Sequence, residues 1–337
     1  MPSLSSSPSA RRTLSIGGAT YDLFVRTGQG IREENLGTKM LTLPLGEKIR
    51  VEQVIETCGG GAGNTAVGLA RLGCTAHFSG ILGSDQWGQR LLENFRTENV
   101  DAHGATIVEG ETSSFSIILT AKSGERVILY EPGTNAHLHD ATFDRECAAT
   151  MEWIYLNHIH EHSCVIEDDI VALLKKNPAM GFTWNPGGPQ LTAGIGDKSN
   201  QILLRETDLL VFNKEEARTF TGKKTIDAAL DALLVHGVAI ACISDGKNGC
   251  FAADGKKRLH CPVIPDAPIV ETTGAGDAFG TGATWALLQG FDLPTMLRAG
   301  TINATSVIGA VGAQAGLLTD IEMRQRLQDS QLDVEEC

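Results

Sequence analysis

Residues 271–282 read Glu-Thr-Thr-Gly-Ala-Gly-Asp-Ala-Phe-Gly-Thr-Gly, a glycine-rich turn with one carboxylate in its middle. The apolar run 268–270 before the turn predicts a strand, and the apolar run 283–288 after it predicts a helix. A helix that begins at such a turn presents unpaired backbone N–H groups and the positive end of its dipole. These groups bind a phosphate or a developing oxyanion. Because Asp277 lies in the same turn, it is placed to accept a proton from an attacking hydroxyl.

The turn has two interpretations when it is taken alone. An anion-binding turn beside a general base is what a small-molecule kinase needs. Glycine-rich turns are also common before helices, and an aspartate in the first helical turn often serves only as a cap. The residues of this turn therefore leave phosphoryl transfer and a purely structural role open.

A second glycine-rich block lies at residues 58–73, Cys-Gly-Gly-Gly-Ala-Gly-Asn-Thr-Ala-Val-Gly-Leu-Ala-Arg-Leu-Gly. Its glycines let the backbone approach a ligand closely, and Asn64 offers both a donor and an acceptor to a hydroxyl. Asn64 could instead cap a helix. A dinucleotide-binding loop is not supported, because the spacing is not G-x-G-x-x-G and no acidic residue follows the next strand as expected.

The two blocks together resemble the two signatures of the ribokinase, or PfkB-type, family of sugar and nucleoside kinases. Residues 272–277 resemble the C-terminal signature and residues 58–73 the N-terminal one, in the family's order. The resemblance runs from about Thr13 to about Thr319. It implies an α/β, three-layer ribokinase-like fold, with a mostly parallel twisted sheet flanked by helices and a small β-sheet lid. The lid is expected from about residues 20–26, 47–56 and 112–131.

The pattern along the chain agrees with an α/β fold. Compact apolar runs at 153–156, 180–184, 209–212 and 239–244 alternate with helix-length segments, which favours a mostly parallel sheet covered on both faces. No repeat and no Pro/Ser linker marks an internal boundary, so we expect one main domain. The expected division is a disordered tail at 1–12, a kinase domain at 13–330 and a frayed acidic tail at 331–337.

Composition excludes several classes of function. The net charge of −13 disfavours binding to nucleic acid or to an acidic membrane surface. No run of eighteen apolar residues is present, so no membrane span is expected. The eight cysteines include no C-x-x-C pair, which argues against a zinc ribbon and favours a reducing, cytoplasmic compartment. The Ser-rich start with two arginines leaves a short targeting segment open as an alternative to a disordered tail.

The resemblance also implies a sugar site. The residue matching Asp22 hydrogen-bonds a substrate hydroxyl in the family, although a turn aspartate can also bond its own backbone. Asn157 stands where ribokinase-like enzymes often carry a glutamate near the sugar, so the substrate stays open. The implied substrate-binding residues are Thr20, Asp22, Gly59, Gly60, Gly61, Gly63, Asn64, Asn157 and Asp277.

Catalysis is expected at Asp277 as general base, with Gly274, Ala275 and Gly276 as the anion hole. No G-x-x-x-x-G-K-[ST] motif is present, so this turn must hold the phosphates instead of a P-loop. Asn213 and Glu216 match the family's N-x-x-E motif and are expected to hold Mg²⁺ through water, or to form a capping box. The implied ATP-binding residues are Asn213, Glu216, Ser244, Gly246, Gly249, Gly276 and Thr301.

Besides Mg²⁺, the resemblance implies a possible site for a monovalent cation. Many relatives carry an aspartate at the position of Glu271 and use it, with nearby carbonyls, to bind K⁺. Because glutamate is one methylene longer, activation by K⁺ is an open expectation here. The matching positions are Glu271, Thr273, Val307, Ala310 and Gly312.

Three further motifs have mainly structural interpretations. Residues 83–88 fit a G-x-D-x-x-G turn in which Asp85 begins a helix. Gly133 and Asn135 fit a turn on which some relatives carry a substrate contact. The alternating histidines His158, His160 and His162 could bind a metal, but a polar loop is favoured because no fourth ligand is in view.

The sequence therefore predicts an ATP- and Mg²⁺-dependent kinase acting on a hydroxymethyl group of a free sugar of the ribose or fructose type. A nucleoside kinase is the alternative within this class. A non-catalytic regulator that binds a sugar or nucleotide is the alternative from another class. A homodimer is expected through the lid, because an exposed sheet edge invites pairing.

Overall fold

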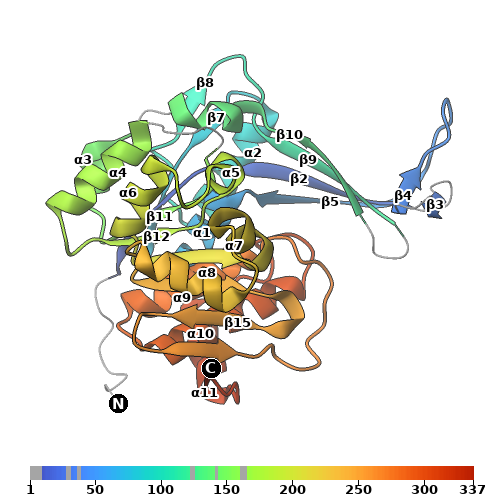
Figure 1. The fold of residues 1–337 in the computed structure, drawn as a ribbon. Coiled ribbons are helices and arrows are strands. Elements are labelled where there is room, and N and C mark those ends of the chain that lie inside the picture. The colour runs from blue at the N-terminus through green and yellow to red at the C-terminus, as the bar shows by residue number, and fades with distance from the viewer. Residues whose placement is uncertain (1–9, 28–31, 36–38, 122–125, 141–142, 160–164) are drawn as a thin grey trace.

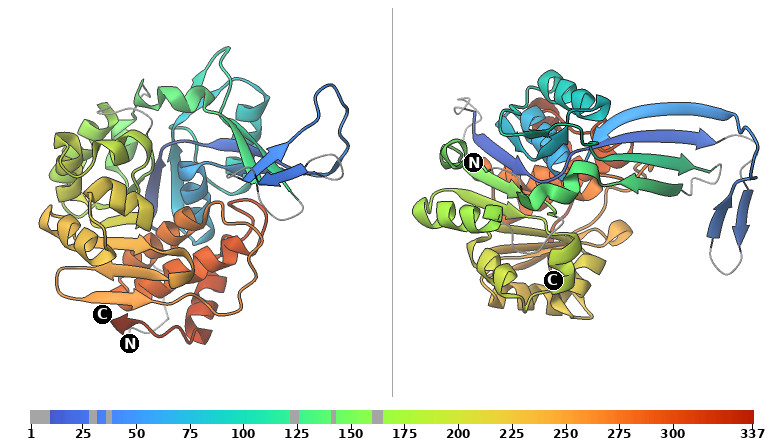
Figure 2. Two further views of the ribbon diagram at one scale, coloured as in Figure 1. Left: turned by 45° about the vertical axis from the view of Figure 1, so that its right-hand side comes forward. Right: turned by 90° about the horizontal axis from the view of Figure 1, so that it is seen from above.

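The computed structural model describes residues 10–27, 32–35, 39–121, 126–140, 143–159 and 165–337. Helices cover both faces of a large sheet, and a smaller sheet projects from one end of this body (Figures 1 and 2). This is the three-layer arrangement with a lid that the sequence predicts, and it is confirmed. None of the helices in these described ranges is long and apolar enough to cross a membrane.

The large sheet has nine strands in the order β17-β16-β15-β14-β13-β12-β11-β1-β6. The strands from β6 to β14 in this order run parallel, and β15, β16 and β17 are added antiparallel. Central strands such as β11 and β12 are apolar at nearly every position because both of their faces are covered. The bounds are β1 Arg12–Ile16, β6 Thr75–Ser79, β11 Trp153–Leu156, β12 Gly181–Trp184, β13 Leu209–Asn213, β14 Ile240–Ser244, β15 Cys250–Ala253, β16 Arg258–Cys261 and β17 Glu335–Glu336.

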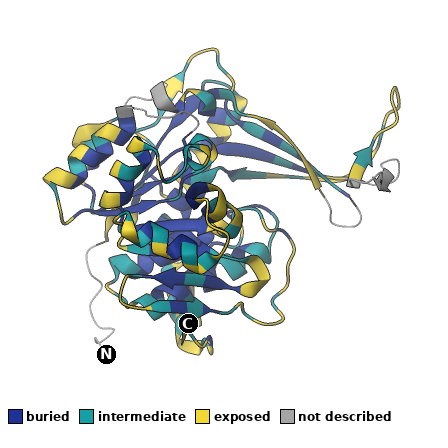
Figure 3. Cartoon of the chain, viewed as in Figure 1, coloured by how far each residue is buried: buried dark blue, intermediate teal, exposed yellow. Residues whose placement is uncertain are grey.

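Two apolar cores lie on the two faces of this sheet, and Figure 3 shows the buried strands between the partly exposed helices. The helices of the first core are α1 Gly61–Arg71, α2 Gln86–Thr97, α9 Ala275–Leu288, α10 Leu293–Ile308 and α11 Asp320–Asp329. The helices of the second are α3 Arg145–Ala149, α4 Val165–Lys176, α5 Gly188–Ala193, α6 Lys198–Glu206, α7 Lys214–Thr221 and α8 Ile226–Val235.

The lid is a four-stranded sheet in the order β10-β9-β2-β5. Its strands are β2 Thr20–Thr27, β5 Val51–Gly59, β9 Phe115–Thr120 and β10 Arg126–Glu131. Because β2 follows β1 directly and β5 leads directly into α1, the lid is tied to the large sheet where β1 ends. Smaller elements are the pairs β3 Arg32–Asn35 with β4 Lys39–Thr42 and β7 Ile81–Gly83 with β8 Thr106–Val108, and the 3₁₀ turns η1 Gly133–Asp140 and η2 Gly246–Asn248.

The strand predicted before the glycine-rich turn is wrong, and residues assigned to both predicted tails pair with the large sheet. Residues 268–270 form no strand; Ile269 and Val270 are exposed in an irregular segment. Arg12, assigned to the N-terminal tail, is the first residue of β1, and its N–H donates to Glu152 Oε2 over 3.0 Å. Near the C-terminus, where the sequence predicts a frayed tail, Glu335 and Glu336 pair with β16.

Candidate functional site

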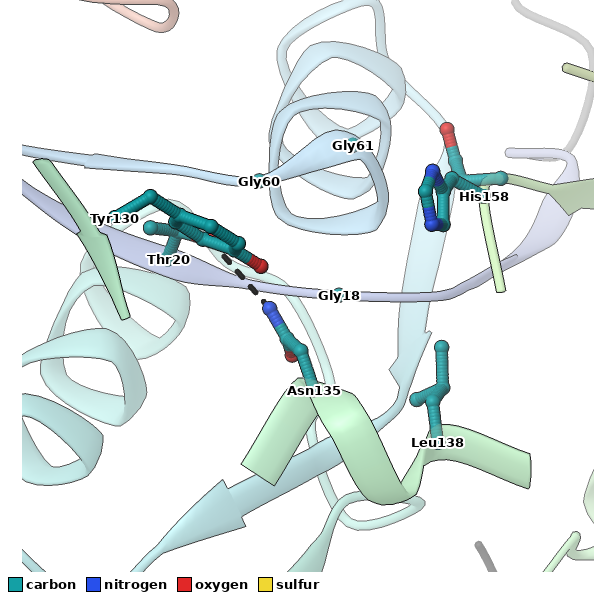
Figure 4. Close-up of a pocket in the computed structure, with 9 residues that line it drawn as sticks. Gly18, Thr20, Gly60, Gly61, Tyr130, Asn135, Leu138 and His158 are labelled. Carbon is teal, nitrogen blue, oxygen red and sulfur yellow. Dashed lines mark hydrogen bonds between the residues drawn. The ribbon is translucent and has the colours of Figure 1, made fainter. Parts of the chain in front are cut away.

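A cavity of about 290 Å³ lies where the lid meets the carboxyl ends of the parallel strands (Figure 4). In an open α/β sheet this is the edge at which ligands bind. Figure 4 shows the Tyr130 ring and Asn135 on one side of the cavity and His158 on the other. The lining residues are Gly18, Thr20, Gly60, Gly61, Tyr130, Asn135, Leu138, Asn157 and His158.

Two buried carboxamides line this cavity with incomplete hydrogen bonding. Asn157 Nδ2 donates to Thr65 Oγ1 over 3.0 Å, and Asn135 Nδ2 donates to the Ala19 carbonyl over 3.2 Å. The Oδ1 atoms of both asparagines are buried and have no hydrogen-bond partner in the described part of the chain. A buried acceptor without a donor is costly, so the cavity is suited to a ligand that brings O–H or N–H donors.

Two glycines of the block at 58–73 let the end of β5 pack closely against the start of β2. Gly60 has φ +83°, and a Cβ there would lie 2.6 Å from Ala19 Cα. A Cβ at Gly59 would lie 2.4 Å from Asp22 Oδ2. A larger residue at either position would push β5 away from β2, so the glycines set the distance between these two lid strands beside Asp22.

Asp22 is buried on β2, with about 7% of its surface exposed. Burial raises the pKa of Asp22 to about 6, the nearby Glu271 raises it further, and the hydrogen bond from Ser116 partly opposes the rise. A carboxyl with this pKa is ionised at neutral pH and accepts hydrogen bonds from hydroxyls.

Asp277 lies in the first turn of α9, whose N-cap is Gly274 in the left-handed region at φ +79°. Asn64 Nδ2, from α1, donates to Asp277 Oδ2 over 2.8 Å. Removal from water raises the pKa of Asp277 to about 6, the Asn64 hydrogen bond opposes this rise, and the charge of Glu216 adds to it. The structure thus joins the two glycine-rich blocks through a hydrogen bond to the predicted base.

The turn predicted to bind an anion has room for a ligand. A Cβ at Gly274 would lie 2.4 Å from Ala313 Cβ, so this glycine is required by packing. A Cβ at Gly276 would meet no atom of the described chain within 4 Å. Open space therefore lies beside Gly276 at the start of α9. Free N–H groups at the start of a helix bind anions.

Asn213 and Glu216 form the capping box that the sequence left open. The Glu216 N–H donates to Asn213 Oδ1 over 2.9 Å, and the Asn213 N–H donates to Glu216 Oε2 over 2.7 Å. Burial raises the pKa of Glu216. A carboxylate in electrostatic reach of Asp277 fits Mg²⁺, which prefers oxygen ligands and keeps several of its waters.

The remaining residues of the predicted nucleotide site lie on β14, η2 and α10. Ser244 pairs in register with Asn213, so the two motifs end adjacent strands. Gly246 and Gly249 adopt positive φ around η2. Thr301 is buried, and its hydroxyl contacts Cys250 Sγ at 3.4 Å and Cys261 Sγ at 3.5 Å.

The candidate cation residues come together, but not around an open carboxylate. Glu271 Oε1 accepts hydrogen bonds from Thr273 Oγ1 over 2.9 Å and from the Arg126 guanidinium. The Val307 carbonyl accepts from the Ala310 N–H over 3.1 Å. Gly312, at φ +87°, lies against Thr57 of the lid. Glu271 Oε1 is therefore already engaged by an arginine and by Thr273, and a K⁺ ion could bind this oxygen only by displacing these donors.

Comparison with known proteins decides the family. The chain matches the family described as pfkB family carbohydrate kinase over residues 36–320, well over half of its length. The chain belongs to the pfkB family of carbohydrate kinases. This kinase is therefore an ATP-dependent phosphotransferase.

Three relatives of this pfkB kinase cover between three quarters and nearly all of its length. It is 27% identical over 315 residues to a ribokinase of Bacillus subtilis, with 93% of this chain and 98% of the relative covered. It is 27% identical over 260 residues to an uncharacterized sugar kinase of Archaeoglobus fulgidus, with 76% of this chain and 100% of the relative covered. A solved Arabidopsis thaliana ribokinase complexed with ribose and ATP has a TM-score of 0.79 at 22% identity, covering 96% of this chain and 100% of that one.

Sequence analysis missed several residues of this pfkB kinase. Gln314 Nε2 donates to Asn64 Oδ1 over 3.3 Å, and its Oε1 accepts from Asn94 Nδ2 over 2.9 Å. Gln314 thereby orients the side chain that bonds Asp277. Neither Gln314 nor the cavity residues Tyr130 and Leu138 lie in a recognisable motif, so no pattern pointed to them.

The structure describes most residues of the three motifs for which mainly structural interpretations were given. Asp85 caps α2 as predicted, accepting the Gly88 N–H over 2.9 Å. Asn135 lines the cavity, and its contact with a substrate stays a prediction. His158 lines it too, whereas His160 and His162 lie outside the described residues. No cluster of three or more metal-ligating side chains occurs among the residues that the structure covers.

Proposed function

We propose that this kinase transfers the γ-phosphate of ATP to a hydroxymethyl group of a free sugar of the ribose or fructose type. The observation that carries the proposal is the hydrogen bond between Asn64 and Asp277. The Asn64 N–H donates to the carbonyl of Gly60, which lines the cavity, and its side chain donates to Asp277. A sugar in the cavity would therefore lie one helical turn from a carboxylate at the start of α9.

The proposed reaction is an in-line displacement at phosphorus. The hydroxymethyl oxygen attacks the γ-phosphorus, the bond to the ADP oxygen breaks, and the hydroxyl proton passes to an Asp277 oxygen. The Asn64 donor holds the carboxylate in orientation. The N–H groups of the turn Gly274–Gly276 stabilise the charge on the transferred group. Bound Mg²⁺ neutralises phosphate charge, and Glu216 with Asn213 would hold it through water.

A free sugar is favoured by the polarity and the size of the cavity. The unpartnered oxygens of Asn135 and Asn157 are acceptors in the cavity wall, which match the hydroxyl donors of a sugar. At about 290 Å³ the cavity is at the small end of the range for ligand sites. A nucleoside is the second candidate, because the half-exposed Tyr130 ring at the cavity could stack on a base.

Two further proposals concern the molecule in the cell. The lid presents exposed apolar residues, which favours a homodimer through this sheet. These residues are Val51, Val54, Val127, Ile128, Leu129 and Tyr130. The seven cysteines that the structure describes are free, which favours the reducing cytoplasm.

The proposed function is tested by incubating the protein with ATP, Mg²⁺ and a panel of pentoses, hexoses and nucleosides. We expect ADP release that depends on a pentose or hexose, with phosphorylated sugar as product. Turnover of nucleosides alone would select the second candidate. Tight sugar binding without turnover would contradict the proposal and indicate a binding protein.

A further inference from the structure

Arg126 connects the lid to the segment that precedes the anion-binding turn. It is the first residue of β10, the edge strand of the lid. Its Nη1 donates to Glu271 Oε1, and its Nη2 donates to Thr272 Oγ1 over 3.3 Å. Glu271 is about 9% exposed and the Arg126 side chain about 33%, so the carboxylate is shielded from water while the guanidinium stays partly exposed. A pair with one shielded partner is screened less by solvent than an ion pair on the open surface.

Glu271 Oε1 is a crowded oxygen. Besides the Arg126 guanidinium it accepts from the Thr272 N–H over 2.9 Å, the Thr273 N–H over 3.0 Å and Thr273 Oγ1 over 2.9 Å. These donors fold residues 271–273 tightly around the carboxylate. The chain then passes directly into Gly274, the N-cap of α9. The position of Glu271 thus determines where the anion-binding turn begins.

The charge on Glu271 needs a positive partner, because a buried unpaired carboxylate is strongly unfavourable. In many relatives, as the family resemblance implies, a monovalent cation is the positive partner of the carboxylate at this position. Here the guanidinium is in direct contact with the carboxylate, and a cation at the same oxygen would have to displace it. The backbone nearby is also engaged, since the Ile308 carbonyl accepts the N–H groups of Val270 and Glu271 over 2.8 and 3.2 Å.

We propose that Arg126 is a built-in substitute for a monovalent cation, so that this kinase is independent of K⁺ and its anion-binding turn is set by the lid. The proposal rests on the proposed function for its kinetic test. Arg126 acts through Glu271 and is a positioning residue. Because it lies on the lid, the turn reaches its working geometry only while β10 covers the site.

The first test uses the wild-type protein in KCl, NaCl or N-methylglucamine chloride at equal ionic strength. We expect kcat and KM for ATP to agree within about a factor of two in all three salts. A severalfold rise in rate with K⁺ over N-methylglucamine would overturn the proposal.

The second test removes the guanidinium group by substitution of Arg126. Arg126→Ala should lower kcat/KM by about tenfold to a hundredfold, because a misplaced turn loses its alignment with the phosphate. Added guanidinium or K⁺ should restore part of the lost rate, a response that a merely structural role would not produce. Arg126→Lys should keep most of the activity. An alanine variant with wild-type activity, or one that no cation rescues while it stays folded by circular dichroism, would overturn the proposal.

Arg26→Ala is the matched control. Arg26 lies on β2 of the same lid, 64% exposed, with Glu52 at 3.9 Å as its ion-pair partner. None of the contacts described for Arg26 involves Glu271 or the turn Gly274–Gly276. We expect this variant to keep wild-type activity and to show no response to guanidinium.

A measurement of cation binding that needs no turnover distinguishes a failure of this proposal from a failure of the proposed function. If no sugar or nucleoside is phosphorylated, the proposed function fails, but cation binding can still be measured. We expect the wild-type Tm to be the same in K⁺ and N-methylglucamine, and the Tm of Arg126→Ala to rise with K⁺, since a ligand that binds only the native state stabilises it. A wild-type Tm that rises with K⁺ would overturn the substitution of the cation by Arg126.

Discussion

At the scale of single residues, the central contact joins Asn64 and Asp277, which are 213 positions apart in the chain. The sequence predicted both residues from separate motifs. It could not predict that they bond to each other, since a side-chain contact between distant segments depends on how α1 and α9 pack. The role of Gln314 was hidden for the same reason, because only the folded structure places its amide against Asn64.

Asp277→Asn tests the base directly. We expect kcat to fall by about 10²–10⁴-fold, as is typical when a general base is removed. Burial raises the pKa of Asp277, so its charge destabilises the folded state at neutral pH, and the variant should have an equal or higher Tm. Steady-state kinetics and thermal unfolding measure both effects.

The control for this variant is Asp333→Asn, the same change at an exposed position near the C-terminus. It should leave both the rate and the Tm unchanged. Wild-type turnover by Asp277→Asn would show that another group accepts the proton.

The pH dependence of kcat/KM is expected to reflect the ionisation of two carboxyl groups. Burial raises the pKa of both Asp22 and Asp277 to about 6, and both act in their ionised form. We therefore expect kcat/KM to be highest above this pH and to fall as the pH decreases through about 6, more steeply than for one group. Asp22→Asn should reduce the residual slope to that of a single group. A flat profile across this range would contradict both assignments.

At the scale of elements, the start of α9 is the decisive feature. The glycine-rich turn was predicted from sequence because only glycine combines a left-handed N-cap with close backbone packing. The strand predicted before it, at 268–270, does not exist. Ile269 and Val270 have high β-propensity, but they pair with no strand in the described part of the chain, and the Val270 N–H donates to the Ile308 carbonyl at the end of α10 instead.

Two glycines of this turn should respond differently to alanine. Gly276→Ala adds a methyl group to open space within a helix, so the Tm should be equal or higher, while KM for ATP rises and kcat falls by about tenfold or more. Gly274→Ala forces alanine into φ +79° against Ala313 and should lower the Tm. A Gly276→Ala enzyme with normal kinetics would show that the phosphates bind elsewhere.

At the scale of the whole molecule, apolar runs were a sufficient guide to the parallel sheet, whereas the lid was implied by the resemblance to the family. The central strands are apolar runs, and of the lid strands β9 shows an alternation of more and less buried residues. The antiparallel strands β15, β16 and β17 were missed. They are short, and their pairing depends on long-range contacts, above all between the C-terminus and β16.

Removal of residues 331–337 tests the contribution of this edge. It deletes β17, opens the β16 edge and removes Leu332, which is 8% exposed within the first core. Loss of one buried leucine alone costs about 2 kcal/mol, so we expect a Tm lower by a few degrees and unchanged kcat. Leu332→Ala in the full chain separates the side chain from the strand. An unchanged Tm after truncation would mean that this edge adds no stability.

The central claim is that a sugar hydroxyl, Asp277 and the start of α9 meet at one point. A crystal structure with a sugar found active in the substrate panel, Mg²⁺ and a non-hydrolysable ATP analogue tests it most directly. We predict the hydroxymethyl oxygen within hydrogen-bonding distance of Asp277, and the terminal phosphate on the N–H groups of Gly274–Gly276. A terminal phosphate bound away from this turn, or a sugar whose hydroxymethyl group points away from Asp277, would contradict the account.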